Sequence, residues 1–174
     1  ETRWNSSYEK YEAVFDGSNF FYIPYSKEDA IGKAMKGMFS MEILFSPDGG
    51  VNPFSSMESG GLGYEITSGS QLAFYYRANN KWVLPNNNCH TPIQLGKDIY
   101  YHAVVTYDNG AKVKEVKVSG TFNFPKKDQA PDYLLGIGGD YRDTATPSIQ
   151  NPFIGKIVYA KLYKGVLSNL DITN

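Results

Sequence analysis

The chain has 174 residues, with 17 Lys and Arg against 18 Asp and Glu and a formal net charge of -1. This length fits one domain with a core of its own, and we expect a single domain over residues 1–174. The balanced charge argues against a nucleic-acid binder, which usually carries a basic excess. No apolar run approaches the roughly 18 residues that a membrane-spanning helix needs. The single cysteine excludes an intrachain disulfide.

Aromatic residues and turn-forming residues dominate the composition, with 14 Tyr, 10 Phe, 17 Gly and 9 Pro. Such a composition is typical of many short strands joined by tight turns. Apolar residues alternate with others along much of the chain, as in Phe39, Met41, Ile43 and Phe45. Alternation of this kind predicts strands with one buried face. In chain order, the predicted strands are 13–15, 19–23, 39–45, 63–67, 72–77, 81–84, 101–107, 116–118, 121–124, 133–137 and 153–163.

Turn and helix signals complete the pattern. The sequence Asp108-Asn109-Gly110 predicts a hairpin turn, because Asn and Gly tolerate a positive φ. Helical signals are confined to 27–36, which follows Ser26, and to a final turn at 169–172 that Ser168 can cap. Residues 46–61, rich in Ser, Gly and Pro, are expected to form a loop at an edge. Strands at short spacing without alternating helices predict an all-β antiparallel sandwich or barrel.

Several segments, read in order, resemble one family. They are Val14-Phe15-Asp16-Gly17, Phe39-Ser40-Met41-Glu42-Ile43, the strand from Tyr101 to Asp108, Leu135-Gly136-Ile137-Gly138, and the stretch from Phe153 to Ser168. Together they resemble the strands of laminin-G-like, concanavalin A-like domains of bacterial type. The resemblance implies an antiparallel two-sheet jelly-roll sandwich. It also implies a structural hydrogen bond for His102. The chain departs from the family where an acidic pair is replaced by Val158-Tyr159.

The sequence shows neither the carboxylate pair of a glycosidase on one strand nor a set of residues typical of a zinc site. A glycosidase needs two carboxyl groups facing one bond, and on a single strand that requires acids separated by one residue. No such pair occurs in the chain, and Glu42 is followed by Ile43, Leu44 and Phe45. Cys89 and His90 are adjacent, so on an extended chain they point to opposite sides. A zinc site needs three or four such ligands, and the chain has three nitrogen or sulfur candidates in all. We predict that the domain is not an enzyme.

The glycine-rich run from Gly136 to Asp143 has the order GIGGDYRD. A dinucleotide fingerprint must open a helix and needs a third glycine at the right spacing, and neither condition is met. Two interpretations stay open. Asp140, Tyr141 and Arg142 either shape a turn or face a ligand. Calcium takes six to eight oxygen ligands, and Asp140 with Asp16 could supply some of them, since relatives often hold calcium at the rim of the sandwich.

Sugar binding fits the aromatic content best. Carbohydrate modules offer flat aromatic faces to the sugar ring, surrounded by amide, carboxylate and arginine groups. Tyr75 and Arg77 share one strand face, and Asn79 and Trp82 follow closely. Tyr141 and Arg142 repeat the pairing of an aromatic residue with an arginine. We therefore predict that these six residues contact a ligand.

The resemblance and the lack of catalytic geometry together predict a non-catalytic carbohydrate-binding module of an exported bacterial protein. Its partner would be a polysaccharide or glycan, with no nucleic acid and no membrane span. We expect an extracellular, cell-surface or periplasmic location, and other domains of a parent hydrolase or lipoprotein. Two alternatives stay open. One is a protein-binding or domain-packing spacer, and the other is a glycoside hydrolase or lyase of the same fold.

Overall fold

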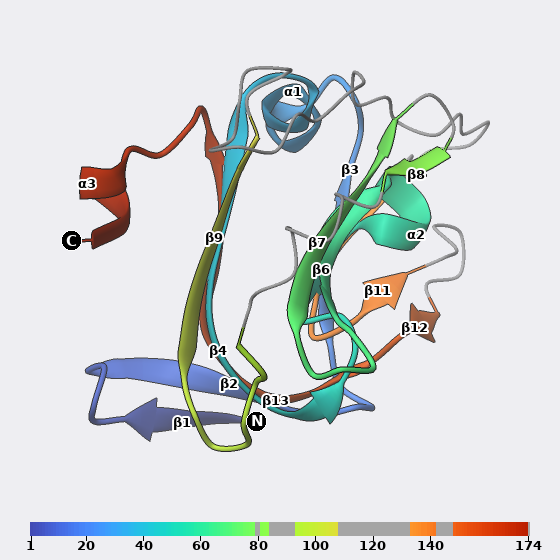
Figure 1. Ribbon diagram of the computed structural model, residues 1–174. Helices are drawn as coiled ribbons and strands as arrows, with labels where there is room; N and C mark the ends of the chain where they lie inside the picture. Colours follow the sequence, from blue (N-terminus) through green and yellow to red (C-terminus); the bar gives the residue numbers. More distant parts are fainter. Residues whose placement is uncertain (79–80, 84–92, 108–132, 142–147, 174) are drawn as a thin grey trace.

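A computed structural model describes residues 1–78, 81–83, 93–107, 133–141 and 148–173. Their strands form two antiparallel sheets that pack face to face (Figure 1). The predicted all-β antiparallel sandwich is therefore confirmed. None of the helices in the described part of the chain is long and apolar enough to span a membrane.

The first sheet, called sheet A, has five described strands. In spatial order they are β1 (Thr2–Asn5), β2 (Lys10–Asp16), β13 (Phe153–Lys164), β4 (Phe39–Gly50) and β9 (Tyr101–Tyr107). The second sheet, called sheet B, has six, in the order β3 (Phe21–Tyr25), β10 (Tyr133–Ile137), β5 (Phe54–Ser55), β6 (Leu62–Ile66), β7 (Leu72–Ala78) and β8 (Lys81–Val83). The remaining elements are the pair β11 (Asp140–Tyr141) and β12 (Ile149–Gln150), and the helices α1 (Ala30–Lys36), α2 (Met57–Gly60) and α3 (Asn169–Thr173).

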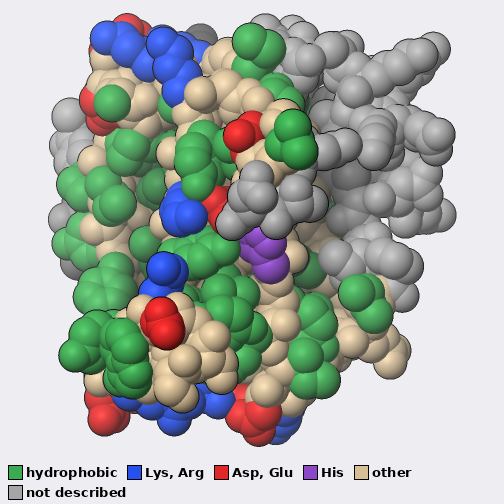
Figure 2. All heavy atoms as spheres, turned by 90° about the vertical axis from the view of Figure 1, so that its left-hand side faces the viewer, with side chains coloured by type: hydrophobic (Ala, Val, Ile, Leu, Met, Phe, Trp, Pro, Cys, Tyr) green, Lys and Arg blue, Asp and Glu red, His purple; other side chains and the backbone are tan. Residues whose placement is uncertain are grey.

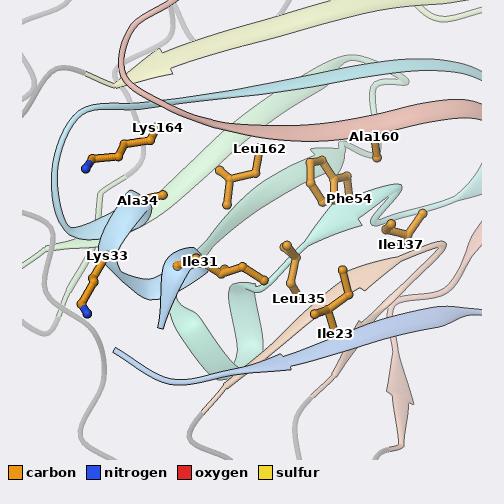
Figure 3. A pocket seen from close by; sticks show the side chains of 11 residues that line it. Ile23, Ile31, Lys33, Ala34, Phe54, Leu135, Ile137, Ala160, Leu162 and Lys164 are labelled. Atoms are coloured by element: carbon orange, nitrogen blue, oxygen red, sulfur yellow. The ribbon is translucent and has the colours of Figure 1, made fainter. Parts of the chain in front are cut away.

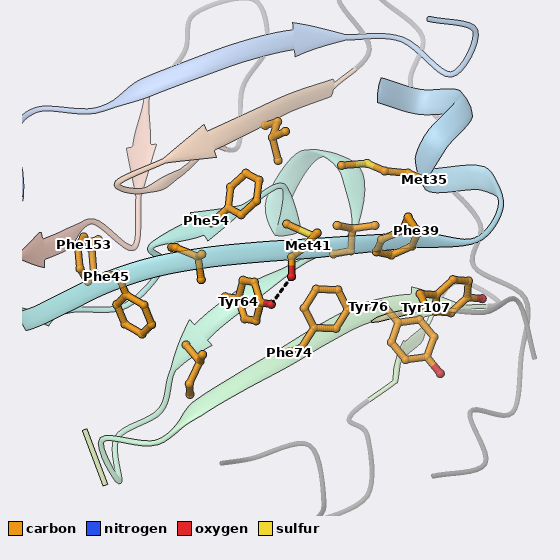
Figure 4. Packing of buried hydrophobic residues seen from close by; sticks show 14 of the residues in the cluster. Met35, Phe39, Met41, Phe45, Phe54, Tyr64, Phe74, Tyr76, Tyr107 and Phe153 are labelled. Carbon is orange, nitrogen blue, oxygen red and sulfur yellow. Dashed lines mark hydrogen bonds between the residues drawn. The ribbon is translucent and has the colours of Figure 1, made fainter. Parts of the chain in front are cut away.

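The core lies between the sheets and is largely aromatic (Figure 4). Phe39, Met41, Ile43 and Phe45 of β4 are at most 1% exposed, so the predicted alternation on this strand is confirmed. Opposite them lies Tyr64 of β6, whose hydroxyl donates a hydrogen bond of 2.7 Å to the Met41 carbonyl. Full burial of a large apolar side chain stabilises a fold by roughly 1.5–3 kcal/mol. This shared core therefore holds the two sheets together.

A β-bulge divides β13 into two halves. Ile157 pairs with Phe45 and Tyr159 pairs with the adjacent Leu44, so Val158 is an extra residue in the ladder. Before the bulge, odd-numbered residues such as Phe153 and Ile157 face the core. After it, the even-numbered Ala160 and Leu162 pack against the core, and odd-numbered residues face outward. A bulge re-aims the side chains that follow it, and here it turns a row of polar and aromatic residues out of the sandwich.

Other elements differ from the expectation. The strands β1, β5, β11 and β12 and the short helix α2 were not predicted, and residues 46–61 are largely buried rather than a loop at an edge. The small hydroxyl of Ser59 explains how polar residues fit inside, because it both donates to the Leu134 carbonyl and accepts from the Leu134 N–H, at 2.9 Å each. The predicted strands 116–118 and 121–124 and the turn at 108–110 lie outside the described residues.

Candidate ligand-binding face

Polar and aromatic side chains gather on the outer face of sheet A, the side turned away from sheet B. Basic side chains and a histidine lie among hydrophobic ones on this side of the molecule (Figure 2). The β1–β2 hairpin and α3 both project to the same side, at the left in Figure 1. Strand β13 contributes Tyr159, Lys161 and Tyr163, which the bulge has turned outward. These features make the outer face of sheet A the candidate site.

Glu42 lies at the centre of this face, on β4, and is only 8% exposed. Its Oε2 accepts hydrogen bonds from the Tyr163 hydroxyl at 2.5 Å and from Lys161 Nζ at 3.3 Å. Its Oε1 lies 3.0 Å from His102 Nε2 on β9. The hydrogen bond expected for His102 is therefore present, and Glu42 is the partner. A buried carboxylate needs such donors, because an unpaired buried charge is costly.

The pKa values on this face follow from burial and hydrogen bonding. Burial acts to raise the pKa of Glu42, but hydrogen bonds from Tyr163, His102, Tyr159 and Lys161 outweigh it and leave that pKa below its ordinary value. Burial, followed by the hydrogen bond to Glu42, raises the pKa of Tyr159 to about 12. Glu42 is therefore an anion at neutral pH, and the tyrosine is a neutral donor.

Lys161 is held between two aromatic rings. Its ammonium group lies 4.1 Å from the ring centroid of Tyr159 and 6.0 Å from that of Tyr163. A cation over an aromatic face is stabilised by roughly 0.5–1 kcal/mol at exposed sites. The Lys161 side chain remains 46% exposed. The cation is thus fixed in place and still accessible to a ligand.

A second buried carboxylate, Glu12 of β2, organises the neighbouring part of this face and is 2% exposed. Its Oε1 is paired with Arg3 Nε, and its Oε2 accepts hydrogen bonds from Asn5 Nδ2 at 2.8 Å and from the Tyr100 hydroxyl. Burial alone would raise the pKa of Glu12, but the hydrogen bonds from Tyr100, Asn5 and Arg3 lower it overall. Arg3 and Glu12 face each other in the β1–β2 register, so the hairpin itself builds this cluster.

Tyr8 connects the two clusters. Its ring lies 5.1 Å from that of Tyr100, and it is close enough to Tyr159 to contribute to the raised pKa of that residue. Tyr8 is 37% exposed, and the rings of Tyr100, Tyr159 and Tyr163 are half-buried. A continuous row of tyrosines therefore runs between two satisfied carboxylates, with ring surface left open to solvent.

The predicted ligand residues Tyr75 and Arg77 lie on a different surface, the outer face of sheet B. Both are half-buried on β7, opposite the core residues Leu72, Phe74 and Tyr76. Burial and then the charge of Glu65 raise the pKa of Tyr75. Arg77 pairs with Trp82 in the β7–β8 register, so the backbone brings these two positions together. Asn79 and Arg142 lie outside the described residues, as does the side chain of Trp82.

Tyr141 and Asp140 lie inside the molecule. Tyr141 is 0% exposed, with its ring 5.1 Å from Phe20 and 5.3 Å from Tyr22. Asp140 is also 0% exposed, and its two oxygens accept the N–H groups of Glu58 and Tyr141 at 2.8 and 2.9 Å. Burial raises the pKa of Asp140 to about 7. Both side chains are therefore internal, and they connect β11 to α2 and β3 instead of presenting a surface for a sugar.

The two residues considered for calcium, Asp16 and Asp140, each accept hydrogen bonds from the chain. Asp16 Oδ1 accepts three hydrogen bonds within its own turn, from the Ser18 N–H and hydroxyl and from the Asn19 N–H. The oxygens of Asp140 are occupied by backbone donors. In the described part of the chain, no three His, Cys, Asp or Glu side chains lie close enough to hold a metal ion. Calcium needs several converging oxygens, so neither aspartate enters the function proposed below.

The residues at the centre of the face, Glu42, Glu12, Tyr8, Lys161 and Tyr159, were not predicted as site residues. The sequence shows Glu42 alone on its strand and Tyr159 as a departure from the family pattern. One signal was available: replacement of the acidic pair by Val158-Tyr159 falls on the bulge, where side-chain direction changes. These residues contact one another across strands that are distant in sequence. Alternation within one strand cannot predict such contacts.

No protein-family model and no curated protein matches the chain. Solved structures do match. Domain 4 of AbnA, a GH43 extracellular arabinanase from Geobacillus stearothermophilus, in complex with arabinotriose, is 15% identical. The match covers 99% of this chain and 78% of that one, with a TM-score of 0.63.

Botulinum neurotoxin structures match as well. For the type C toxin, whose cell entry is dependent upon interaction with two ganglioside molecules, the identity is 13% and the TM-score 0.55. The binding domain of botulinum neurotoxin DC in complex with SialylT is 16% identical, with a TM-score of 0.54. Each match covers 99% of this chain but only 44% and 43% of the toxin chains. The likeness is one of fold. This chain has a β-sandwich shared with carbohydrate-binding domains.

Proposed function

We propose that this domain is a non-catalytic carbohydrate-binding module of an exported bacterial protein, laminin-G-like in type, with its glycan on the outer face of sheet A. The supporting observation is the row of partly exposed tyrosines between the two buried carboxylates Glu12 and Glu42. The ring faces of Tyr8 and Tyr159 suit the C–H side of a sugar, and Lys161 and His102 suit its hydroxyl groups. Structures with this fold include one bound to arabinotriose.

In this proposal, Glu42 and Glu12 position other groups and do not touch the ligand. Each is almost fully enclosed, and both oxygens of each are already used by donors from the chain. A ligand on this face would contact the solvent-exposed side of the side chains that donate hydrogen bonds to Glu42 and Glu12. Fixed side chains lose less conformational entropy on binding, which favours affinity. The two carboxylates therefore hold the ligand-contacting side chains in place before the ligand binds.

The same carboxylates support a binding role over hydrolysis. A glycosidase needs one carboxyl group with a raised pKa as proton donor, next to a second carboxylate. On this face, both Glu12 and Glu42 have lowered pKa values. Asp140 has a raised pKa, but it is fully buried and faces backbone N–H groups. An acid without access to a glycosidic bond cannot protonate it.

A panel of immobilised glycans tests the proposal, with arabinan and sialylated oligosaccharides among its members. We expect one class to bind, and Tyr159→Ala and Tyr8→Ala each to weaken binding about 5- to 30-fold, as for an interface residue worth 1–2 kcal/mol. Tyr159→Phe keeps the ring and should retain most of the affinity. Tyr11→Ala is the matched control, since Tyr11 is 67% exposed and points away from Glu12 on the same strand.

Two outcomes would contradict the proposal. Binding that survives both tyrosine variants but is lost in Tyr75→Ala or Trp82→Ala would move the site to the outer face of sheet B. A flat response to the whole panel would favour the second candidate, a module that packs against another protein domain. That candidate has an observation of its own: Phe21, Tyr22 and Ile23 of β3 are 57%, 43% and 44% exposed in one continuous stretch.

A further inference from the structure

A cavity of about 480 Å³ lies between the sheets beside α1 (Figure 3). It is distinct from the outer face of sheet A, because its walls come from the inner side of β13, from β3, β5 and β10 of sheet B, and from α1. Its lining is almost wholly apolar and includes Ile23, Ile31, Phe54, Leu135, Ile137 and Leu162. Pockets for small molecules have volumes of roughly 300–1,000 Å³ and are mostly apolar. The size and lining both fit a small apolar ligand.

The cavity is left open by two short side chains, one on the helix α1 and one on the strand β13. Ala34 of α1 and Ala160 of β13 lie on its walls and leave space that a larger residue would fill. The start of α1 is held by Asp29, whose carboxylate accepts the N–H groups of Ser26 and Gly32 at 2.7 and 2.9 Å. A Cβ at Gly32 would lie 2.0 Å from the Ser26 carbonyl oxygen, so the helix already packs closely against the preceding segment.

Two lysines mark one end of this cavity. Lys33 of α1 and Lys164 of β13 are both exposed, and both contribute to its lining. In Figure 3 they lie at the same end, away from Ile137 and Ala160. No carboxylate of the described residues forms an ion pair with either lysine, whereas the nearby Lys36 is paired with Glu28 at 2.7 Å. An apolar hollow with two exposed cations at its end is complementary to a ligand that has an apolar body and an anionic head.

We propose that this cavity binds one alkyl chain that ends in a carboxylate, with the chain between the sheets and the head group at Lys33 and Lys164. The proposal is independent of glycan binding, because the two sites lie on different sides of sheet A. The apolar lining supplies affinity through burial of methylene groups, at about 4-fold per methylene. The lysines supply the preference for an anionic head.

The test is a calorimetric titration of the whole domain with decanoate below its micelle concentration, repeated with octanoate and with decan-1-ol. We expect saturable binding of one decanoate per chain, with octanoate about 16-fold weaker because it lacks two methylenes. Methyl NMR signals of Ile31, Leu135 and Leu162 should shift during the titration. Absence of saturable binding, or shifts confined to methyl groups outside the cavity, would overturn the proposal.

Variants of the protein distinguish the contribution of the anionic head group from that of the alkyl chain. The double variant Lys33→Gln/Lys164→Gln should weaken decanoate binding about 3- to 10-fold, as expected for two partly exposed ion pairs, and leave decan-1-ol binding unchanged. Lys10→Gln, at an exposed position of β2, is the matched control. Ala160→Leu should abolish binding of both ligands by filling the cavity. If Ala160→Leu does not fold, Ala34→Leu provides the same block from the helix side. Unchanged decanoate affinity in a folded blocking variant would refute the site.

The alkyl chain could come from a free carboxylate or from a membrane lipid. Flotation with phosphatidylglycerol vesicles distinguishes these sources. Vesicle binding that is competed by decanoate and lost in the blocking variant would extend the site to membrane lipids. Vesicle binding without saturable decanoate binding would instead show attraction of the lysines to an anionic surface, and the proposal would fall.

Discussion

The carboxylate of Glu42 on β4 and the hydroxyl of Tyr163 on β13 are joined by a hydrogen bond of 2.5 Å, although 121 residues separate them in sequence. Both side chains point away from the core. For Tyr163 this direction depends on the extra residue Val158, because strict alternation from Ile157 would turn it inward. The candidate site thus depends on one irregularity in the sheet.

Deletion of Val158 should prevent folding. Without the extra residue, Tyr159, Lys161 and Tyr163 would face the core and Ala160 and Leu162 would face outward, so a charge would be buried without a partner. We expect insoluble protein, or a soluble chain without a cooperative thermal transition in circular dichroism. Val158→Ala, which keeps the residue count, should fold. A deletion variant with native stability would show that the bulge does not set the direction of these side chains.

Glu42→Gln should lower the free energy of unfolding at pH 7 by about 1–3 kcal/mol, since it weakens hydrogen bonds to a charged acceptor. The folded state lowers the pKa of Glu42. Its stabilisation is therefore present above the ordinary carboxyl pKa and is lost as pH falls through the lowered value. Urea unfolding at pH 7 and pH 3 measures both effects, and the difference between wild type and variant should shrink at pH 3.

Glu28→Gln is the control for that measurement, because Glu28 forms an exposed pair with Lys36 and its side chain is 77% exposed. Such surface pairs contribute little. Equal losses in the two variants would argue against a special role for the Glu42 cluster.

Asp140 should produce a pH dependence of the opposite sign. Burial raises its pKa to about 7, so its contribution to stability is fully present below the ordinary carboxyl pKa near 4 and is lost as pH rises through about 7. The free energy of unfolding should fall between pH 4 and pH 7 by on the order of 3–4 kcal/mol from this group. Asp140→Asn should flatten the slope, while Asp16→Asn should leave it unchanged. A wild-type profile with no decline in this window would contradict the prediction.

Gly138→Ala should destabilise the fold by about 2–4 kcal/mol, through backbone strain and overpacking. Gly138 has φ +87°, and a Cβ there would lie 2.1 Å from the Phe15 ring. Gly165→Ala is a matched control, since its φ is +104° but nothing lies within 4 Å of the added Cβ. Chemical denaturation of both variants separates steric overlap from backbone strain. Equal losses would show that strain alone matters at Gly138.

Much of the fold could be predicted from local pattern. Alternation on β4 and β7 marked two core strands, because a buried face repeats every second residue. The glycine run was not interpreted as a dinucleotide-binding site, because it does not open a helix, and in the structure Gly136 and Ile137 end β10. The short strands β5, β11 and β12 were not predicted, because a strand of two residues is too short to show an alternating pattern. Tyr141 shows a further limit: composition identifies an aromatic residue but not whether its ring lies inside or outside.

By itself, the sequence determined the sandwich and its core strands, and its balanced charge argued against nucleic-acid binding. Only the tertiary structure decided where the candidate site lies. The bulge at Val158 turned Tyr159, Lys161 and Tyr163 outward, and strand pairing brought them to Glu42 and His102. Local periodicity reports which face a side chain shares with its near neighbours. Local periodicity does not show where a bulge exchanges the inward and outward positions of a strand. Nor does it show which distant strand supplies the partner of a buried charge.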